Sequence, residues 1–248
     1  MGLLSRPGTL ELMREAVRLG VETVGGLDPC GIDGDPIRHL EAIFSLAAEF
    51  DRGIDIHLHD PGELGIWQIA RIVDFTERFE RQGRVMISHA YCLGSVPWQR
   101  VAPQAERLAA NGISLATTAP ADRTVPPFLK LCAAGVNVCL GCDGIRDAWS
   151  PLGNGDMLEK AMMQAYRFDL CKDDELVAAF DAASLCGARA LGLEGYGLYV
   201  GDRADLLLLP AENLPDAVVN RPAARTLLRA GQVIVEDGEL LLDPRAGR

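Results

Sequence analysis

The chain has 248 residues, enough to bury a sizeable core, and its 48% hydrophobic and 24% charged residues are typical of a globular protein. A formal net charge of −11 argues against a basic surface for nucleic acid or anionic membranes. No apolar run approaches the roughly 20 residues of a membrane helix, and the N-terminus lacks the charged-then-apolar plan of a signal peptide. The seven scattered cysteines favour thiols in a reducing cytoplasm.

Helical and alternating apolar patterns follow one another along the first part of the chain. The patterns predict helices over residues 9–20, 37–50, 65–82, 98–111 and 126–134, and strands over residues 21–27, 54–60, 84–89, 114–118 and 137–143. Strands separated by amphipathic helices of this length indicate βαβ units and a parallel sheet. The fold class predicted for this part is therefore α/β.

The pattern of predicted secondary structure changes towards the C-terminus. Two further helices are predicted over residues 157–169 and 173–186, and β-rich stretches follow over residues 201–209 and 226–236. Residues 230–232 read as a hairpin turn. We therefore expect a barrel portion over residues 1–193 that carries the site, and a small β segment over residues 194–248.

Ionisable side chains gather at the C-terminal ends of three predicted strands. The stretch Ile-Asp-Ile-His-Leu-His-Asp-Pro-Gly over residues 54–62 carries His57, the next strand ends in His89, and the last one ends in Asp143. Parallel barrels and sheets display their chemistry at this edge. Imidazole and carboxylate groups there are candidate metal ligands or proton carriers.

Other imidazoles and thiols near these strands are predicted to be structural. We expect strand alternation to turn His59 away from His57, which gives His59 a packed, non-catalytic role. His39 lies on a predicted helix and is expected at the surface. Cys139 and Cys142 formally match a Cys-x-x-Cys pair, but residues three apart in a strand face opposite ways, so we interpret both as buried thiols.

The ordered set resembles the amidohydrolase superfamily, in its cytosine deaminase-like branch, over essentially the whole chain. The set is His57, His89 and Asp143, followed by Asp147-Ala-Trp-Ser-Pro-Leu-Gly153 and by Gly201-Asp-Arg-Ala-Asp205. The resemblance implies part of a (β/α)8 barrel, strands 4–8, with a C-terminal β-sandwich segment. It also implies a hydrolase that acts on C–N bonds other than peptide bonds, removes an amino group from a pyrimidine or related N-heterocycle, and uses one divalent ion, iron or zinc.

Site roles follow from the same resemblance, residue by residue. It implies that His57, His89 and Asp143 are metal ligands, and that His89 and Asp143 also orient or activate the attacking water. Asp60 lies where relatives carry a proton-shuttling Glu, so the resemblance makes it catalytic. An Asp side chain is one methylene shorter than Glu, and Glu63 in the following loop is the alternative.

Two further positions bear on the substrate. Trp149 lies where relatives have a pocket-lining Trp, although a core Trp is an alternative interpretation. Gly144 stands where relatives that use cytosine carry a second Asp in contact with the ring. The Gly favours a bulkier or different heterocycle as the small-molecule substrate, with no nucleic acid and no membrane as partner.

The chain departs from the family pattern at its start. Strands 1 to 3, and the His-x-His ligand pair of strand 1, have no counterpart, so the resemblance covers the C-terminal three-fifths of the family's length. His57-Leu58-His59 lies on strand 5 and is not interpreted as a substitute. A deaminase, a cyclic amidase-type amidohydrolase and a catalytically incomplete fragment all stay open. An open sheet edge favours association, so a homo-oligomer stays open too.

Overall fold

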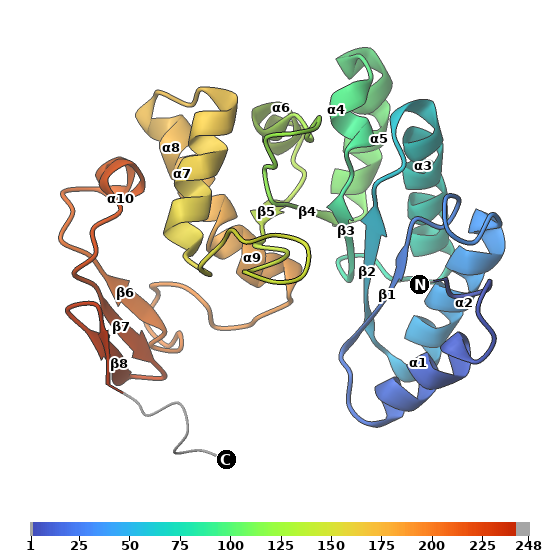
Figure 1. Ribbon diagram of the computed structural model, residues 1–248, viewed down its shortest axis with the longest axis horizontal. Helices are drawn as coiled ribbons and strands as arrows, with labels where there is room; N and C mark the ends of the chain where they lie inside the picture. The colour runs from blue at the N-terminus through green and yellow to red at the C-terminus, as the bar shows by residue number, and fades with distance from the viewer. Residues whose placement is uncertain (1, 242–248) are drawn as a thin grey trace. The chain divides into compact units, whose positions relative to one another are not determined.

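The computed structural model describes residues 2–241 and divides into two compact units, Met1–Gly141 and a second unit from Cys142 onward (Figure 1). Each unit is organised around its own sheet, parallel in the first and antiparallel in the second. Among the described residues, no helix combines the length and the apolar character needed to cross a membrane.

The first unit is built on a five-stranded parallel sheet in which each strand pairs with the next one along the chain. The strands are β1 Thr23–Leu27, β2 Gly53–Leu58, β3 Val85–His89, β4 Ser114–Thr117 and β5 Val138–Leu140. Right-handed crossovers between strands in sequential order place all connecting helices on the same face of the sheet. This is the winding of a barrel, and it differs from a doubly wound sheet, whose strand order reverses.

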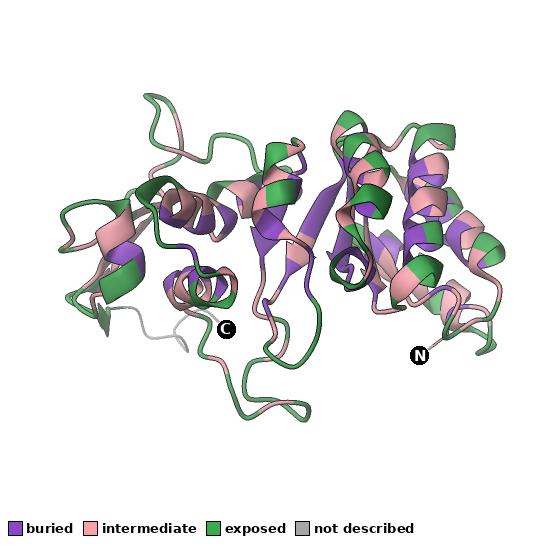
Figure 2. Ribbon diagram, turned by 90° about the horizontal axis from the view of Figure 1, so that it is seen from above, coloured by how far each residue is buried: buried purple, intermediate pink, exposed green. Residues whose placement is uncertain are grey.

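Amphipathic helices cover the outer face of this sheet. They are α1 Thr9–Arg18, α2 Pro36–Phe50, α3 Gly62–Arg78, α4 Cys92–Ser95, α5 Trp98–Ala110 and α6 Phe128–Ala133. The start of α2 is fixed by Asp35, whose side chain accepts a hydrogen bond of 3.1 Å from the amide of Arg38, and by Pro36 in the first turn. Figure 2 shows the resulting burial along the strands and the inner sides of the helices.

The core of the first unit explains why β2 has a single strongly apolar side. Ile54, Ile56 and Leu58 are buried, whereas the residues between them are only half-buried. The buried side of β2 belongs to the same core as the buried side chains of α2 and α3. Because side chains alternate along a strand, Asp55 and His57 lie on the opposite, inner face.

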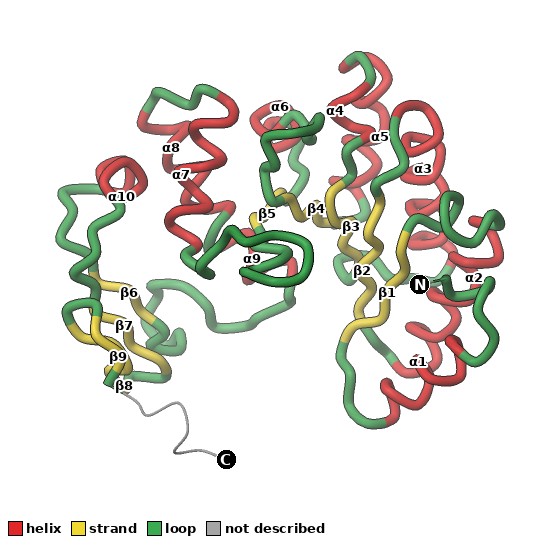
Figure 3. The backbone as a smooth tube through the Cα atoms, viewed as in Figure 1, coloured by secondary structure: helices red, strands yellow, loops and turns green. Residues whose placement is uncertain are grey.

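The second unit combines helices with a small antiparallel sheet (Figure 3). The helices are α7 Met157–Phe168, α8 Asp173–Ala182, α9 Leu185–Ala190 and α10 Leu214–Asn220, and the strands are β6 Leu206–Leu208, β7 Thr226–Arg229, β8 Gln232–Glu236 and β9 Glu239–Leu240. The turn predicted between β7 and β8 is confirmed, with left-handed φ values of 48° at Ala230 and 79° at Gly231.

Several boundaries differ from the sequence-based expectations. The strand expected to reach Asp143 ends at Leu140, so Cys142 and Asp143 lie beyond it and the alternation argument does not apply to Cys142. The helix expected over residues 173–186 breaks into α8 and α9. There Ser184 donates its hydroxyl proton to the carbonyl oxygen of Phe180, which competes with continued helical hydrogen bonding. Helices α4 and α10 and strand β9 have no counterpart among the predicted elements.

Candidate active site

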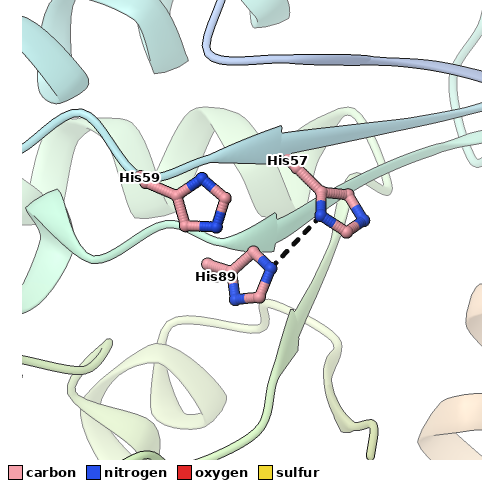
Figure 4. A group of neighbouring side chains, drawn as sticks. All are labelled: His57, His59 and His89. Atoms are coloured by element: carbon pink, nitrogen blue, oxygen red, sulfur yellow. Dashed lines mark hydrogen bonds between the residues drawn. The ribbon is translucent and has the colours of Figure 1, made fainter. Parts of the chain in front are cut away.

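Three imidazoles converge at the C-terminal edge of the parallel sheet (Figure 4). His57 and His59 come from the end of β2, and His89 comes from the end of β3. Each offers one ring nitrogen, and these three atoms lie within 4.8 Å of one another. Three imidazole nitrogens that share one small volume are a typical ligand set for a divalent ion.

The expectation that His59 faces away from His57 is wrong. Residues two apart in a strand share a face, since the side-chain period is two. In addition, β2 ends at Leu58, so that His59 already belongs to the following loop. The ring of His59 lies with its centroid 4.4 Å from that of His89, which makes it a full member of the cluster.

His89 joins the cluster through an unusual backbone conformation. It is the register partner of Leu58, whose side chain is buried on the outer face of the sheet. Strand alternation alone would therefore place His89 away from His57. The φ angle is 71° at His89 and 46° at Ala90, both left-handed. A residue other than glycine in the left-handed conformation costs about 1–3 kcal/mol, and such residues are concentrated at functional sites.

Hydrogen bonds hold the buried His89 ring on both sides. Its Nε2 lies 3.3 Å from Nδ1 of His57, and its Nδ1 lies 3.0 Å from the hydroxyl of Tyr91. The guanidinium of Arg123 stacks 5.3 Å from the centre of the Tyr91 ring, and the carbonyl oxygen of Tyr91 accepts a hydrogen bond from Thr124. The ring of His89 is therefore fixed by a chain of contacts from β2 to the loop after β4.

Carboxylates lie next to the other two imidazoles. Asp28, directly after β1, has its Oδ2 2.9 Å from Nδ1 of His59. Asp55 lies on the inner face two residues before His57, and its Oδ2 is 3.7 Å from Nε2 of His57. Burial raises the pKa of Asp55, although a hydrogen bond from Ser88 and the nearby His57 oppose the rise.

A cavity of about 470 Å³ runs along β1 and reaches the inner-face residues Asp55 and His57. It is also lined by His39 and by residues of the N-terminal segment and α1. The expectation that His39 lies at the surface is wrong, because its side chain is only 1% exposed and its Nδ1 lies 2.7 Å from Oδ2 of Asp33. The apolar face of α2, and not its polar face, carries this histidine.

Asp60 lies beside the cluster and is held by other partners. Its Oδ2 accepts hydrogen bonds of 2.8 Å from Nε2 of Gln68 and 3.2 Å from the amide of Gly31. The ligating group found among the described residues consists of the three histidines. A proton-shuttling role for Asp60 stays a prediction. It requires the carboxylate to transfer protons to the substrate while it keeps its hydrogen bond to Gln68.

The remaining predicted site residues belong to the second unit. Asp143 is exposed and has a left-handed φ of 58°. A Cβ at Gly144 would lie 2.4 Å from Oδ2 of Asp147, so the carboxylate of Asp147 occupies the space that a side chain at 144 would need. Asp147 is fixed there by the amides of Trp149 and Ser150, at 2.8 and 3.0 Å. Trp149 itself is 85% exposed. The roles of these residues stay predictions.

Sequence reasoning missed Asp28, Asp55 and Tyr91. The only sequence signal for Asp28 is its place directly after a predicted strand, at the edge where the histidines were expected. Asp55 could have been found by the same period-two argument that placed His57. Tyr91 lies in a loop after His89, where periodicity gives no direction.

Fold and site together define a barrel-type α/β protein with an imidazole cluster at the catalytic edge of its sheet. The sequence matches the amidohydrolase family over residues 1–236, and the chain belongs to that family. The N-isopropylammelide isopropyl amidohydrolase of Pseudomonas sp. (strain ADP) is 33% identical over 227 residues, which cover 91% of this chain and 56% of that protein.

Solved structures agree with this assignment. The N-isopropylammelide isopropylaminohydrolase of Burkholderia multivorans ATCC 17616 superposes with a TM-score of 0.95 at 41% identity, covering 97% of this chain and 62% of that one. A 5-methylcytosine deaminase from Klebsiella pneumoniae gives a TM-score of 0.84 at 27% identity, covering 98% and 63%. The predicted partial amidohydrolase barrel with its β segment is thereby confirmed, and the chain spans about three-fifths of the length of these relatives.

Members of this family use a divalent metal, and the histidine cluster fits such an ion. Two nitrogens that bind one tetrahedral ion at about 2.0–2.1 Å lie about 3.3–3.4 Å apart. His89 Nε2 and His57 Nδ1 are 3.3 Å apart, and the third imidazole lies within the 4.8 Å limit of the group. Neutral imidazole suits zinc and iron alike.

Proposed function

We propose that this chain carries the metal-binding edge of an aminohydrolase that removes an amine from an N-heterocycle by hydrolysis. The observation that supports this most strongly is the convergence of His57, His59 and His89 at the C-terminal edge of the sheet. The names of the relatives, which describe deamination of ammelide and cytosine derivatives, agree with this chemistry.

The metal would be held by His57, His89 and His59, with Asp143 kept as the ligand expected from the family. The ion, iron or zinc, would supply a Lewis acid that lowers the pKa of a bound water to about 7. His89, a ligand through Nε2 whose Nδ1 is fixed by Tyr91, would orient the attacking water at the ion.

The reaction begins when water adds to the ring carbon that carries the amino group. Asp60 would accept the water proton and deliver it to the leaving nitrogen. The C–N bond then breaks, the ring carbon becomes a carbonyl, and the amine departs. The cavity of about 470 Å³ that reaches His57 has a volume suited to one small heterocycle.

The proposal also includes the domain bounds, the residues that border the substrate and the cellular compartment. We propose that residues 1–193 form the barrel portion and residues 194–248 the β segment, that Trp149 and Gly144 border the substrate, and that the protein works in the reducing cytoplasm. All seven cysteines are present as thiols, which agrees with such a compartment.

The metal content of the purified chain tests the proposal first, on a gel-filtration peak of defined mass. We expect about one zinc or iron ion per chain, lost in His57→Ala and in His89→Ala. The metal-loaded protein should then release isopropylamine from N-isopropylammelide, and chelation should stop the release reversibly.

The alternatives give different results in the same experiment. A metal-loaded protein that opens a cyclic amide without releasing an amine would favour the cyclic amidase. A folded protein of defined mass that binds neither zinc nor iron would favour a catalytically incomplete fragment and refute the proposed activity for this chain.

A further inference from the structure

Asp28 makes two hydrogen bonds to His59 at once. Its Oδ2 lies 2.9 Å from the ring Nδ1, and its Oδ1 accepts a hydrogen bond of 2.5 Å from the backbone amide of the same residue. Both side chains are largely shielded from solvent, with 15% and 34% of their surface exposed. One carboxylate therefore fixes both the backbone and the ring of His59.

The position of Asp28 is itself fixed by the sheet. Its amide donates a hydrogen bond of 2.9 Å to the carbonyl oxygen of His57, which extends the pairing of β1 with β2. Its φ of 40° is left-handed, a conformation that a residue other than glycine adopts at some cost. The strained backbone at the end of β1 thus aims the carboxylate at the loop that follows β2.

A carboxylate in this place decides which nitrogen of His59 carries the proton. An ionised carboxylate only accepts hydrogen bonds, so the Nδ1 facing it carries the hydrogen of the neutral ring. The lone pair is then on Nε2, the nitrogen left for the cluster with His57 and His89. A ligating imidazole commonly has this arrangement, in which the second ring nitrogen donates to a carboxylate.

Two neighbouring carboxylates, those of Asp55 and Asp33, do not do the same for another member of the cluster. Asp55 lies 3.7 Å from Nε2 of His57, beyond hydrogen-bond distance. Asp33 pairs with His39, which is not a member of the histidine group. Of these three carboxylates, Asp28 is the one with a direct hydrogen bond to a ring in the cluster.

We propose that Asp28 is a positioning residue that fixes the Nδ1–H tautomer of His59 and so makes His59 a metal ligand of this site. The second part rests on the proposed metal centre, whereas the tautomer can be judged in the metal-free protein. His59 then completes a ligand set contributed by two adjacent strand ends.

Asp28→Asn gives a sharp test because it keeps the shape of the side chain. The backbone amide of His59 needs an acceptor, so the amide oxygen of Asn must face it and the NH₂ group must face the ring. A donor at that place requires a lone pair on Nδ1, which moves the hydrogen to Nε2. The same exchange in a serine protease triad produces the wrong tautomer.

The tautomer is read from two-bond ¹H–¹⁵N correlation spectra of the metal-free, ¹⁵N-histidine-labelled 248-residue chain. The chain has four histidines, so the ring of His59 is assigned by its loss in His59→Gln. At about pH 8 we expect Nδ1–H in the wild type and Nε2–H in Asp28→Asn. A wild-type ring with its hydrogen on Nε2 would overturn the proposal without any variant.

Zinc affinity, measured by competition with a chromophoric chelator, tests the second part. We expect Asp28→Asn to weaken zinc binding about 10–100-fold, as outer carboxylates of metal sites do. Asp60→Asn is the matched control, because it removes the same charge nearby while its partners are Gln68 and Gly31. It should leave the His59 tautomer unchanged and weaken zinc binding less.

The outcomes separate the two proposals. Equal losses of zinc affinity in both variants would mean that charge alone matters, and would overturn the ligand role of His59. An unchanged tautomer in Asp28→Asn would overturn the positioning role. A wild type that has the Nδ1–H tautomer but binds no zinc would refute the metal centre of the proposed function and the ligand role, while leaving the tautomer assignment in place.

Discussion

Gly26→Ala tests how closely β1 is packed against α2. A Cβ at Gly26 would lie 2.0 Å from Nε2 of His39, 2.9 Å from its Cε1 and 3.1 Å from its Cδ2. Carbon contacts are favourable at about 3.5–4.0 Å, so the imidazole must move by more than about 1 Å. The ring borders the cavity along β1, but it is 1% exposed and held by Asp33 at 2.7 Å, so a movement of this size must weaken that hydrogen bond.

The expected loss of stability is about 2–5 kcal/mol. Overpacking a core costs about 1–3 kcal/mol, and weakening the hydrogen bond to the charged Asp33 adds about 1.5–3 kcal/mol. The reduced freedom of the unfolded chain offsets about 0.4–1 kcal/mol. Urea unfolding measures the change as a lower midpoint at unchanged slope.

The assay needs a probe that reports on the first unit. Trp67 and Trp98 lie there, and the third tryptophan, Trp149, is 85% exposed. A Trp149→Phe background therefore restricts the fluorescence signal to the first unit at small structural cost. Gly53→Ala is the matched control on β2, because its Cβ would lie 3.4 Å from the nearest atom, the Oγ1 of Thr23. We expect this control to change stability by less than about 1 kcal/mol.

A double-mutant cycle with His39→Ala tests the cause. The three atoms nearest to the new Cβ all belong to His39, so Gly26→Ala should cost little once the ring is removed. A cost below about 1 kcal/mol in the wild-type background, or the same cost in both backgrounds, would refute the packing argument.

Two further predictions concern titratable groups. Burial alone would raise the pKa of Asp33, but hydrogen bonds from His39 and from the amides of Ser5 and Leu4 hold it well below the ordinary value of 3.8. The stabilisation by the ionised Asp33 is therefore fully present above about pH 4 and is lost as the pH falls from there through the folded-state pKa. Asp33→Asn should lower the free energy of unfolding by about 2–3 kcal/mol at neutral pH, and in urea unfolding the variant should approach the wild type as the medium is acidified. A difference that does not depend on pH would contradict this. Burial raises the pKa of the Cys92 thiol to about 12. In the folded protein, iodoacetamide should therefore modify the exposed Cys171 well before Cys92. Peptide mass mapping measures both rates, and equal rates would contradict the burial of Cys92.

The order and type of most elements of the first unit could be predicted from sequence patterns, because helical and alternating periodicities are local properties of the chain. The sequence also placed His57 near the C-terminal end of a strand, since Pro61 and Gly62 mark where the strand stops. The hairpin between β7 and β8 was likewise local, fixed by the turn residues Ala230 and Gly231.

The tertiary structure decided which side chains meet. His89 reaches His57 only because its backbone is left-handed, and a strand pattern gives no sign of that φ. Asp28 meets His59, 31 residues away, because the pairing of β1 with β2 brings their ends together. His39 is buried because Gly26 leaves space for its ring on a neighbouring strand. Such contacts depend on register and backbone direction between distant segments, and local periodicity contains neither.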